Sequence, residues 1–272
     1  MVPVAAMVGM GVSAAIAMLL PAGALIWLIT RRAPDGTRRY PQLGRAFVCG
    51  MLAFAVSQVL TRLPLMAFLS TVQQPWAAVL VSAPVASFTA GLFEETGRLL
   101  IMLWLLKRFH RWVDGVSFGL GHGGLEAILV VGLSSVSNLV LAILINSGQT
   151  PAGLSPERIE ALKTTLTATS PELFYLAGLE RVSAIALHVG LSVLVLWGIV
   201  AGRRLLGWAL AVLIHGSANL VVVLTAMVAP VLVAEFVLLA LVVAFWVLFV
   251  WRSRPWFPDG ITPDPAAAAP GR

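Results

Sequence analysis

The sequence places two adjacent carboxylates and an arginine, Glu94, Glu95 and Arg98, inside an apolar stretch that runs from about residue 76 to residue 106. A charged side chain near the centre of a bilayer costs roughly 3 kcal/mol on insertion scales, so such residues face the protein interior and find partners there. Arg98 follows Glu94 by four residues and Glu95 by three, so either carboxylate can reach it on one helix face. The other carboxylate is left for a different task, and we predict a functional site supported by Arg98.

Three further apolar stretches carry ionisable or amide side chains at helical spacing. His122 and Glu126 lie four residues apart and share one helix face, as do His215 and Asn219. His188 lies on the stretch between these two pairs. We expect Glu126 to support the site that these residues form.

The polar residues of these stretches lie at similar depths. A rise of about 1.5 Å per residue, counted from the basic ends of the helices, places them roughly 12–20 Å deep. One cavity, open to the cytoplasmic side, is therefore expected to hold the side chains of five residues on four helices: Glu94, Glu95, His122, His188 and His215. Two other charged positions are expected nearer the outer interface, where Glu180 pairs with Arg181 and Arg62 extends towards the headgroups.

Two hydrolytic chemistries are compatible with this set. In the first, Glu94 or Glu95, held beside His122, positions a water molecule and takes its proton. His215 and the Asn219 amide then donate hydrogen bonds to the developing oxyanion. Together these groups would hydrolyse a peptide bond without a covalent intermediate.

In the second chemistry, His122, His188 and His215 bind Zn²⁺ and leave one position open, with Glu94 or Glu95 as the base. The soluble zinc-peptidase signature H-E-x-x-H is absent from the sequence. We favour the water activated by glutamate, without a metal, because an amide already stands where an oxyanion donor is needed and a metal would itself polarise the carbonyl.

The composition is that of an integral membrane protein. Of the 272 residues, 59% are hydrophobic and only 11% are charged. The formal net charge of +6 comes from short basic loops, as in proteins that fix their membrane orientation this way, and no nucleic-acid partner is expected. The single cysteine excludes an intramolecular disulfide, and Cys49 is expected in the core.

The pattern of apolar stretches predicts an all-α membrane bundle of about seven transmembrane helices. The expected spans are residues 4–29, 46–70, 77–106, 115–145, 172–200, 205–229 and 231–251. Basic and non-basic loops alternate along the chain, which predicts an external N-terminus and a cytoplasmic C-terminus. We expect one domain over 1–254 with a catalytic-type core over 90–220, a short helix after Ser155 in the external loop, and a disordered cytoplasmic tail over 255–272.

The stretch 119–124 reads G-x-G-x-x-G. A dinucleotide site is excluded, because no strand precedes this stretch and it lies in a predicted membrane span. Glycines in such a helix instead allow neighbouring helices to approach closely.

Three motifs occur in order on successive polar helices: Glu-Glu-x-x-Arg over 94–98, Phe-x-x-x-His over 118–122 and His-x-x-x-Asn over 215–219. This order resembles the superfamily of CAAX prenyl proteases and bacteriocin-processing membrane proteases. Within that superfamily, the glycine-rich stretch and the Glu180-Arg181…His188 pattern are most similar to the YhfC family of putative intramembrane metalloproteases. The two-residue spacing before Arg98 is closer to the PrsW-like relatives.

The resemblance implies an intramembrane endopeptidase of the bacterial plasma membrane, which cleaves a membrane protein or peptide in or beside a membrane segment. It implies Glu94 as the activating carboxylate, His122 as its partner, and His215 with Asn219 as oxyanion donors, although the spacing leaves Glu94 and Glu95 open as the base. Two alternatives remain. One is a non-catalytic membrane scaffold on the same fold, and the other is a proton-coupled transporter, which the absence of internal repeats disfavours.

Overall fold

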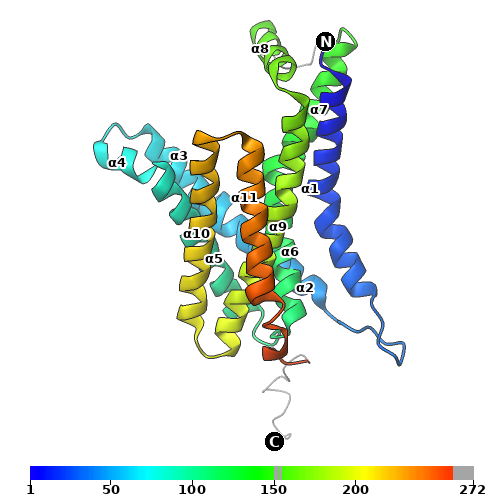
Figure 1. Ribbon diagram of the computed structural model, residues 1–272, viewed down its shortest axis with the longest axis vertical. Helices are drawn as coiled ribbons and strands as arrows, with labels where there is room; N and C mark the ends of the chain where they lie inside the picture. The colour runs from blue at the N-terminus through cyan, green and yellow to red at the C-terminus, as the bar shows by residue number, and fades with distance from the viewer. Residues whose placement is uncertain (150–152, 154, 260–272) are drawn as a thin grey trace, which may run out of the picture.

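The computed structural model describes residues 1–149, 153 and 155–259, and over these residues its regular elements are all helical. Most of the long helices run along one axis of the bundle (Figure 1). In chain order the helices are α1 (Val4–Thr30), α2 (Leu43–Phe54), η1 (Ala55–Arg62), α3 (Leu63–Thr71), α4 (Pro75–Leu80), α5 (Ala83–Leu105), α6 (Trp112–Ala127), η2 (Ile128–Gly132), α7 (Leu133–Asn146), α8 (Pro156–Ala168), α9 (Pro171–Val200), α10 (Arg204–Val228), α11 (Val231–Phe245), η3 (Trp246–Val250) and η4 (Arg254–Trp256).

Six continuous helical stretches of the described chain are long and apolar enough to cross a bilayer. They cover Val4–Thr30, Leu43–Thr71, Trp112–Asn146, Pro171–Val200, Arg204–Val228 and Val231–Val250. A seventh helix, α5, has 23 residues and carries the charged cluster in its middle. The protein is therefore a multi-pass membrane protein, and its helices agree with the expected bundle of about seven spans. The orientation of the termini stays a prediction.

The third expected span differs from the structure at its beginning. Residues 77–106 were predicted to form one helix, but the chain makes a short helix α4 and starts again at Ala83 as α5. Pro84 explains the break, because proline lacks the backbone N–H that a continuous helix needs and is accepted in the first turn of a new helix.

Helix α9 is the central element of the bundle. In its most apolar window 78% of the residues are buried, whereas the corresponding share for the other candidate spans is 17–44%. The peripheral helices expose large apolar side chains, for example Val228 at 88% and Leu205 at 69%, as expected for surfaces that face lipid. Most residues in the central part of α9 are thus shielded from lipid by the helices that surround them, whereas Leu179 remains 55% exposed.

Two glycines of the stretch 119–124 determine how closely α6 approaches its neighbours. A Cβ atom added to Gly119 would lie 2.3 Å from the Val189 Cα atom on α9, and one added to Gly121 would lie 1.9 Å from the Phe47 carbonyl oxygen on α2. No side chain fits at these distances, so the glycines allow close helix contacts. The packing role predicted for this stretch is confirmed.

The peripheral predictions have mixed outcomes. The helix expected after Ser155 is present as α8, and the Ser155 hydroxyl accepts a hydrogen bond from the Arg158 backbone N–H. Cys49 is buried, as expected. The start of the predicted tail forms the short helix η4. The remainder of that predicted tail, 260–272, lies outside the described residues.

Candidate functional site

The five side chains expected to lie together form a polar cluster, and Glu95 lies on its closed side, which does not line a cavity. Both Glu95 and Arg98 are fully buried, and Arg98 Nε lies 2.7 Å from Glu95 Oε2. Arg98 also donates to the Ser192 hydroxyl and, at 3.3 Å, to the His188 carbonyl oxygen. The sequence left open which of the two carboxylates pairs with Arg98. In the structure the partner is Glu95, and Glu94 has different neighbours.

Glu94 is 4% exposed and is held by side chains from two other helices. The Gln58 amide, on η1, donates to Glu94 Oε1. His122 Nε2, on α6, lies 2.9 Å from Glu94 Oε2. The carboxylate is therefore fixed in position while it lines a cavity.

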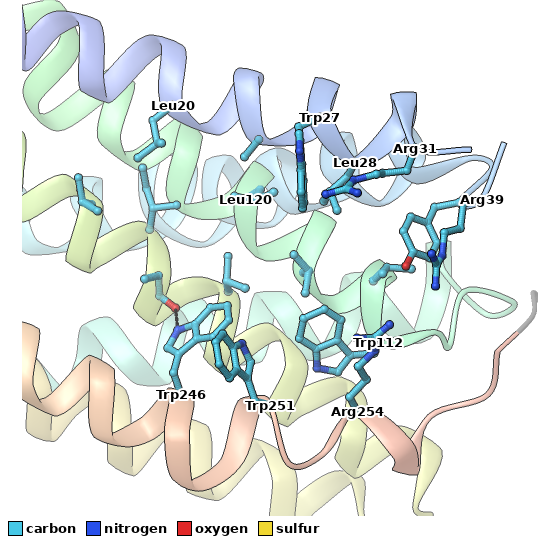
Figure 2. A pocket seen from close by; sticks show the side chains of 18 residues that line it. Leu20, Trp27, Leu28, Arg31, Arg39, Trp112, Leu120, Trp246, Trp251 and Arg254 are labelled. Carbon is cyan, nitrogen blue, oxygen red and sulfur yellow. Dashed lines mark hydrogen bonds between the residues drawn. The ribbon is translucent and has the colours of Figure 1, made fainter. Parts of the chain in front are cut away.

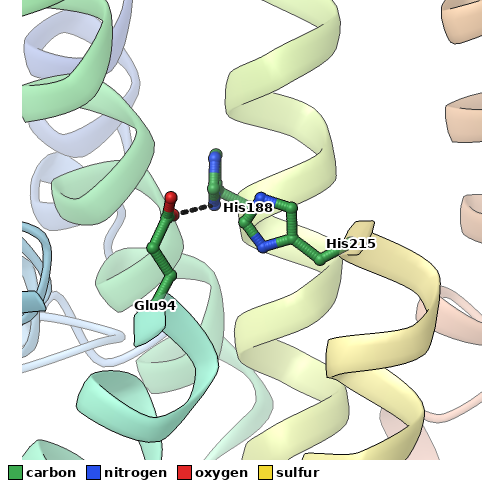
Figure 3. Close-up of side chains that lie close together, drawn as sticks. All are labelled: Glu94, His188 and His215. Atoms are coloured by element: carbon green, nitrogen blue, oxygen red, sulfur yellow. Dashed lines mark ion pairs between the residues drawn. The ribbon is translucent and has the colours of Figure 1, made fainter. Parts of the chain in front are cut away.

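His188 and His215 approach Glu94 from α9 and α10 (Figure 3). Both imidazoles are 3% exposed, and their ring centroids are 5.1 Å apart. His188 Nδ1 lies 3.9 Å from Glu94 Oε2. One ligand atom from each of these three residues lies within 4.8 Å of the others, which is compact enough for a metal ion.

Each of these two imidazoles also contacts a carboxylate other than Glu94, through one of its ring nitrogens. His215 Nδ1 lies 2.9 Å from Glu95 Oε1, and His188 Nε2 lies 2.5 Å from Glu126 Oε2. Metal-binding histidines usually donate one ring N–H to a carboxylate or carbonyl, which fixes the tautomer and leaves the second nitrogen for the metal. The arrangement leaves His215 Nε2 and His188 Nδ1 on the side of Glu94, although His188 Nδ1 also lies 3.1 Å from Arg98 Nη2.

The chemistry of this donor set fits Zn²⁺. Two imidazoles and one carboxylate with an open fourth position are a recurrent ligand set of catalytic zinc. All three residues are buried, so the group is also shielded from bulk water. A cation here would compete with Arg98 Nη2 for His188 Nδ1, while His215 Nε2 has no hydrogen-bond partner among the described residues.

His122 occupies a different place from that of the other two histidines. It is fully buried and lies behind Glu94, with its ring 4.8 Å from the ring of His188. Its Nδ1 atom is buried and has no hydrogen-bond partner in the described part of the chain. The sequence grouped His122 with His188 and His215 as ligands, whereas the structure brings together Glu94, His188 and His215.

A cavity of about 400 Å³ opens from this group. Its lining includes Glu94, His188, His215 and Asn219, and it extends towards Ala83 at the end of the bundle that carries α4 and α8 (Figure 1). The Asn219 side chain makes no hydrogen bond to another described residue, so its amide is available to a ligand in the cavity.

The direction of the cavity is incompatible with holding both the predicted cytoplasmic opening and the predicted orientation of the termini. It lies in the half of the bundle that the basic loops predict to be external. The opposite half is filled, because Glu95, Arg98 and Ser192 pack beneath Phe118, whose ring centroid lies 5.9 Å from Arg98 Cζ. Glu95 is accordingly absent from the lining of the cavity.

Two residues of the site were missed or misplaced by the sequence analysis. Arg62 was expected to extend to the headgroups, but it turns inward and donates to the Ala86 carbonyl oxygen at 2.7 Å and to Gln58 Oε1 at 3.3 Å. Gln58 in turn holds Glu94. The π-helical segment η1 that presents them is a feature often found at functional sites, but the sequence gives no clear signal for it.

The predicted Glu180–Arg181 contact is present, but it is part of a larger network. Arg181 pairs with Glu180 and also with Glu126, whose Oε1 lies 3.2 Å from Arg181 Nη1. Glu126 and Glu180, the two partners of Arg181, line the cavity together with His188. Glu126 thereby connects this ion-pair network to the imidazole of His188.

The sequence of this chain matches a known family of membrane proteins. Residues 16–243 match the family model described as YhfC intramembrane metalloprotease. A relative from Bacillus subtilis (strain 168), described as "Uncharacterized membrane protein YhfC", is 37% identical over 237 residues, which cover 82% of this chain and 86% of the relative. No solved structure matches the chain.

Proposed function

The chain belongs to the YhfC intramembrane metalloprotease family, and we propose that it hydrolyses a peptide bond in or beside a membrane-spanning segment. The observation that carries this proposal is the buried group of Glu94, His188 and His215 at one end of a cavity among membrane-spanning helices. An uncompensated ionisable group is costly in a bilayer, so such a cluster in the interior of a bundle favours a chemical role over a packing role. The bacterial plasma membrane is the proposed location.

We further propose that these three residues hold one divalent cation, with Zn²⁺ the best match to two nitrogen ligands and one oxygen ligand. When bound, such an ion polarises a carbonyl and lowers the pKa of a bound water. This proposal replaces the metal-free preference that the sequence favoured. The reason is that carboxylates engage both imidazoles, His215 through Glu95 and His188 through Glu126, in the manner of metal-binding histidines.

The remaining groups of the cavity have proposed roles in positioning and proton transfer. Gln58 and His122 orient the Glu94 carboxylate. Asn219 donates a hydrogen bond to the carbonyl oxygen of the substrate, where charge develops during attack. Glu126 lines the cavity outside the proposed ligand group, as Glu180 does, and its carboxylate beside His188 accepts the proton released by water.

Comparison of protein N-termini in membranes from two strains tests the peptidase proposal. One strain expresses the wild-type chain and the other expresses His215→Ala at the same level. We expect a set of new N-termini, in or beside membrane segments, only in the wild-type strain. A strain expressing Glu160→Gln, which changes an exposed residue of α8, should match the wild type.

Equal N-termini in the wild-type and His215→Ala strains, with both proteins folded in the membrane, would contradict peptide hydrolysis. That result would support the scaffold alternative, in which the fold is kept and no bond is cleaved.

A further inference from the structure

A second pocket lies on a different side of α9 from the proposed site. It is a groove of about 660 Å³ between α1, α6, α9 and the α11–η3 helix (Figure 2). No residue lines both the groove and the cavity of the proposed site. The volume lies within the range of roughly 300–1,000 Å³ that is usual for small-molecule sites.

The interior of the groove is apolar and largely aromatic. Trp27 stands on α1, opposite Trp246 and Trp251 at the end of the α11–η3 helix (Figure 2). The indole N–H of Trp112 donates to the Val250 carbonyl oxygen at 3.0 Å, and that of Trp246 donates to the Ala186 carbonyl oxygen at 2.9 Å. Because these hydrogen bonds fix two of the rings, the walls are preformed and offer aliphatic and aromatic surface.

Three arginines stand at one end of the groove (Figure 2). The Cζ atom of Arg31 lies 4.0 Å from the ring centroid of Trp27, and that of Arg254 lies 5.8 Å from the ring centroid of Trp112. Arg39 is held similarly, 5.6 Å from the ring centroid of Tyr40. Cation–π contacts of this kind orient a guanidinium and leave its N–H donors available.

Among the described residues, these arginines have no anionic partner. None of the three forms an ion pair with a described carboxylate, and no acidic residue lines the groove. The charged groups of the proposed site differ, because Glu95 and Arg98 neutralise each other there. Within residues 1–149, 153 and 155–259, no carboxylate neutralises these three guanidinium groups, so their N–H donors are available to an anionic ligand.

We propose that the groove binds one anionic phospholipid, with an acyl chain along the tryptophans and the headgroup phosphate against Arg31, Arg39 and Arg254. An anionic head joined to an apolar tail matches the division of the groove into a cationic end and an apolar interior. Basic pockets between transmembrane helices recognise anionic headgroups by the same electrostatics. Arginine suits this role because its planar fork of donors matches phosphate oxygens.

A transmembrane segment of another protein fits the groove less well. The arginines of the groove belong to the basic loops that the sequence places at the cytoplasmic face. Membrane helices usually carry lysine or arginine at that end, and these would be repelled by three unpaired arginines. Charge complementarity therefore favours the lipid over a polypeptide.

Native mass spectrometry of the full-length protein in detergent tests this proposal. The protein is titrated with phosphatidylglycerol or phosphatidylcholine that carry identical acyl chains. We expect one phosphatidylglycerol molecule to bind at least about tenfold more tightly than phosphatidylcholine, since several basic side chains contribute to the attraction. The triple variant Arg31→Gln/Arg39→Gln/Arg254→Gln should lose this preference.

The matched control removes the same charge elsewhere, in Lys107→Gln/Arg203→Gln/Arg204→Gln, whose three positions are exposed and lie outside the groove. The control should keep the preference. A second variant, Ala24→Trp, retains all arginines and fills the apolar part of the groove, so it should weaken the binding of both lipids.

Equal affinity of the wild-type protein for the two lipids would overturn the proposal without any variant. So would an equal loss of preference in both triple variants, because the attraction would then come from net charge alone. Undiminished binding by Ala24→Trp would place the acyl chain elsewhere. Displacement of bound phosphatidylglycerol by a transmembrane peptide present at a lower concentration than the lipid would assign the groove to a polypeptide.

Discussion

Two adjacent residues on α5 divide the polar cluster into an open half and a closed half. Glu95 has no exposed surface and is held by Arg98 and His215. Glu94 lines the cavity, and its carboxylate is shared between an amide on η1 and imidazoles on α6 and α9. Neighbours in the sequence thus face different surroundings, because successive helix residues point about 100° apart.

The comparison teaches that a buried ionisable residue is not by itself a reactive one. The closed half neutralises its charges internally and is packed by helices that approach at glycine. The open half has the same residue types but also has space for a ligand. We infer that the open half carries the proposed chemistry and that the closed half positions its imidazoles.

The largest effect is expected in the open half. Glu94→Gln keeps the shape of the side chain but removes the charge of a proposed metal ligand. We expect the rate of peptide cleavage to fall by more than roughly 10²-fold, because even groups that only orient a metal ligand typically contribute about 10–100-fold. The thermal unfolding midpoint should change little, because the amide can keep one of the hydrogen bonds of the carboxylate. Cleavage is measured with a membrane peptide taken from the substrates found by N-terminal comparison. Wild-type cleavage by Glu94→Gln would move the reactive centre away from the open half.

In the closed half, stability should be lost instead. Arg98→Met leaves the buried Glu95 carboxylate without its cation, and removing one partner of a buried ion pair typically costs about 3–5 kcal/mol. The free energy of unfolding in mixed micelles is the measurement. The double variant Glu95→Gln/Arg98→Met should recover part of the loss, because no uncompensated charge remains.

The contrast between Arg98→Met and its double variant keeps this prediction independent of packing effects. If both variants were equally destabilised, the loss would come from the shape of the arginine side chain and not from its charge.

The sequence predicted the fold and the membership of the cluster better than its internal geometry. The long apolar stretches and basic loops specify helices that agree closely with the observed ones. His188 and His215 were placed at the depth of Glu94 because helix rise is constant along the chain. Helix rotation is set by tertiary packing, so the sequence could not distinguish His122 behind Glu94 from His188 beside it.

The opening of the cavity was beyond the sequence for a related reason. Its direction depends on which half of the bundle is filled, and that follows from contacts between helices distant in the chain. Arg62 shows the same limit. Its position near a helix end favoured the headgroup region, but the π-helical turn of η1 brings it to Gln58 and Ala86.

A smaller loss is expected from disturbing helix packing around the closed half. Gly121→Ala would place a methyl group against the Phe47 carbonyl oxygen, and overpacking of this kind typically costs about 1–3 kcal/mol. Gly23→Ala is the matched control, because a Cβ atom added there meets nothing within 4 Å. Unfolding in mixed micelles should be easier for the first variant only. Equal midpoints would show that α2 and α6 can separate without cost.

The smallest effect is expected outside both halves. On α8, Lys163 Nζ lies 3.2 Å from Glu160 Oε2, with side chains 41% and 67% exposed. Exposed ion pairs contribute about 0–1 kcal/mol, so Lys163→Met should unfold almost as the wild type does. A loss as large as that of Arg98→Met would remove the distinction between buried and exposed charge on which the comparison depends.

The metal content of purified protein tests the central proposal most directly. Wild-type protein is saturated with Zn²⁺, washed free of excess and analysed by elemental mass spectrometry beside His215→Ala, His188→Ala and His122→Ala. We predict about one Zn²⁺ per chain in the wild type, loss in the first two variants and retention in His122→Ala, because that imidazole lies behind Glu94 and outside the ligand group. Wild-type protein that binds no Zn²⁺ and still cleaves its substrate after chelation would contradict the account, as would loss of the ion in His122→Ala with retention in His215→Ala.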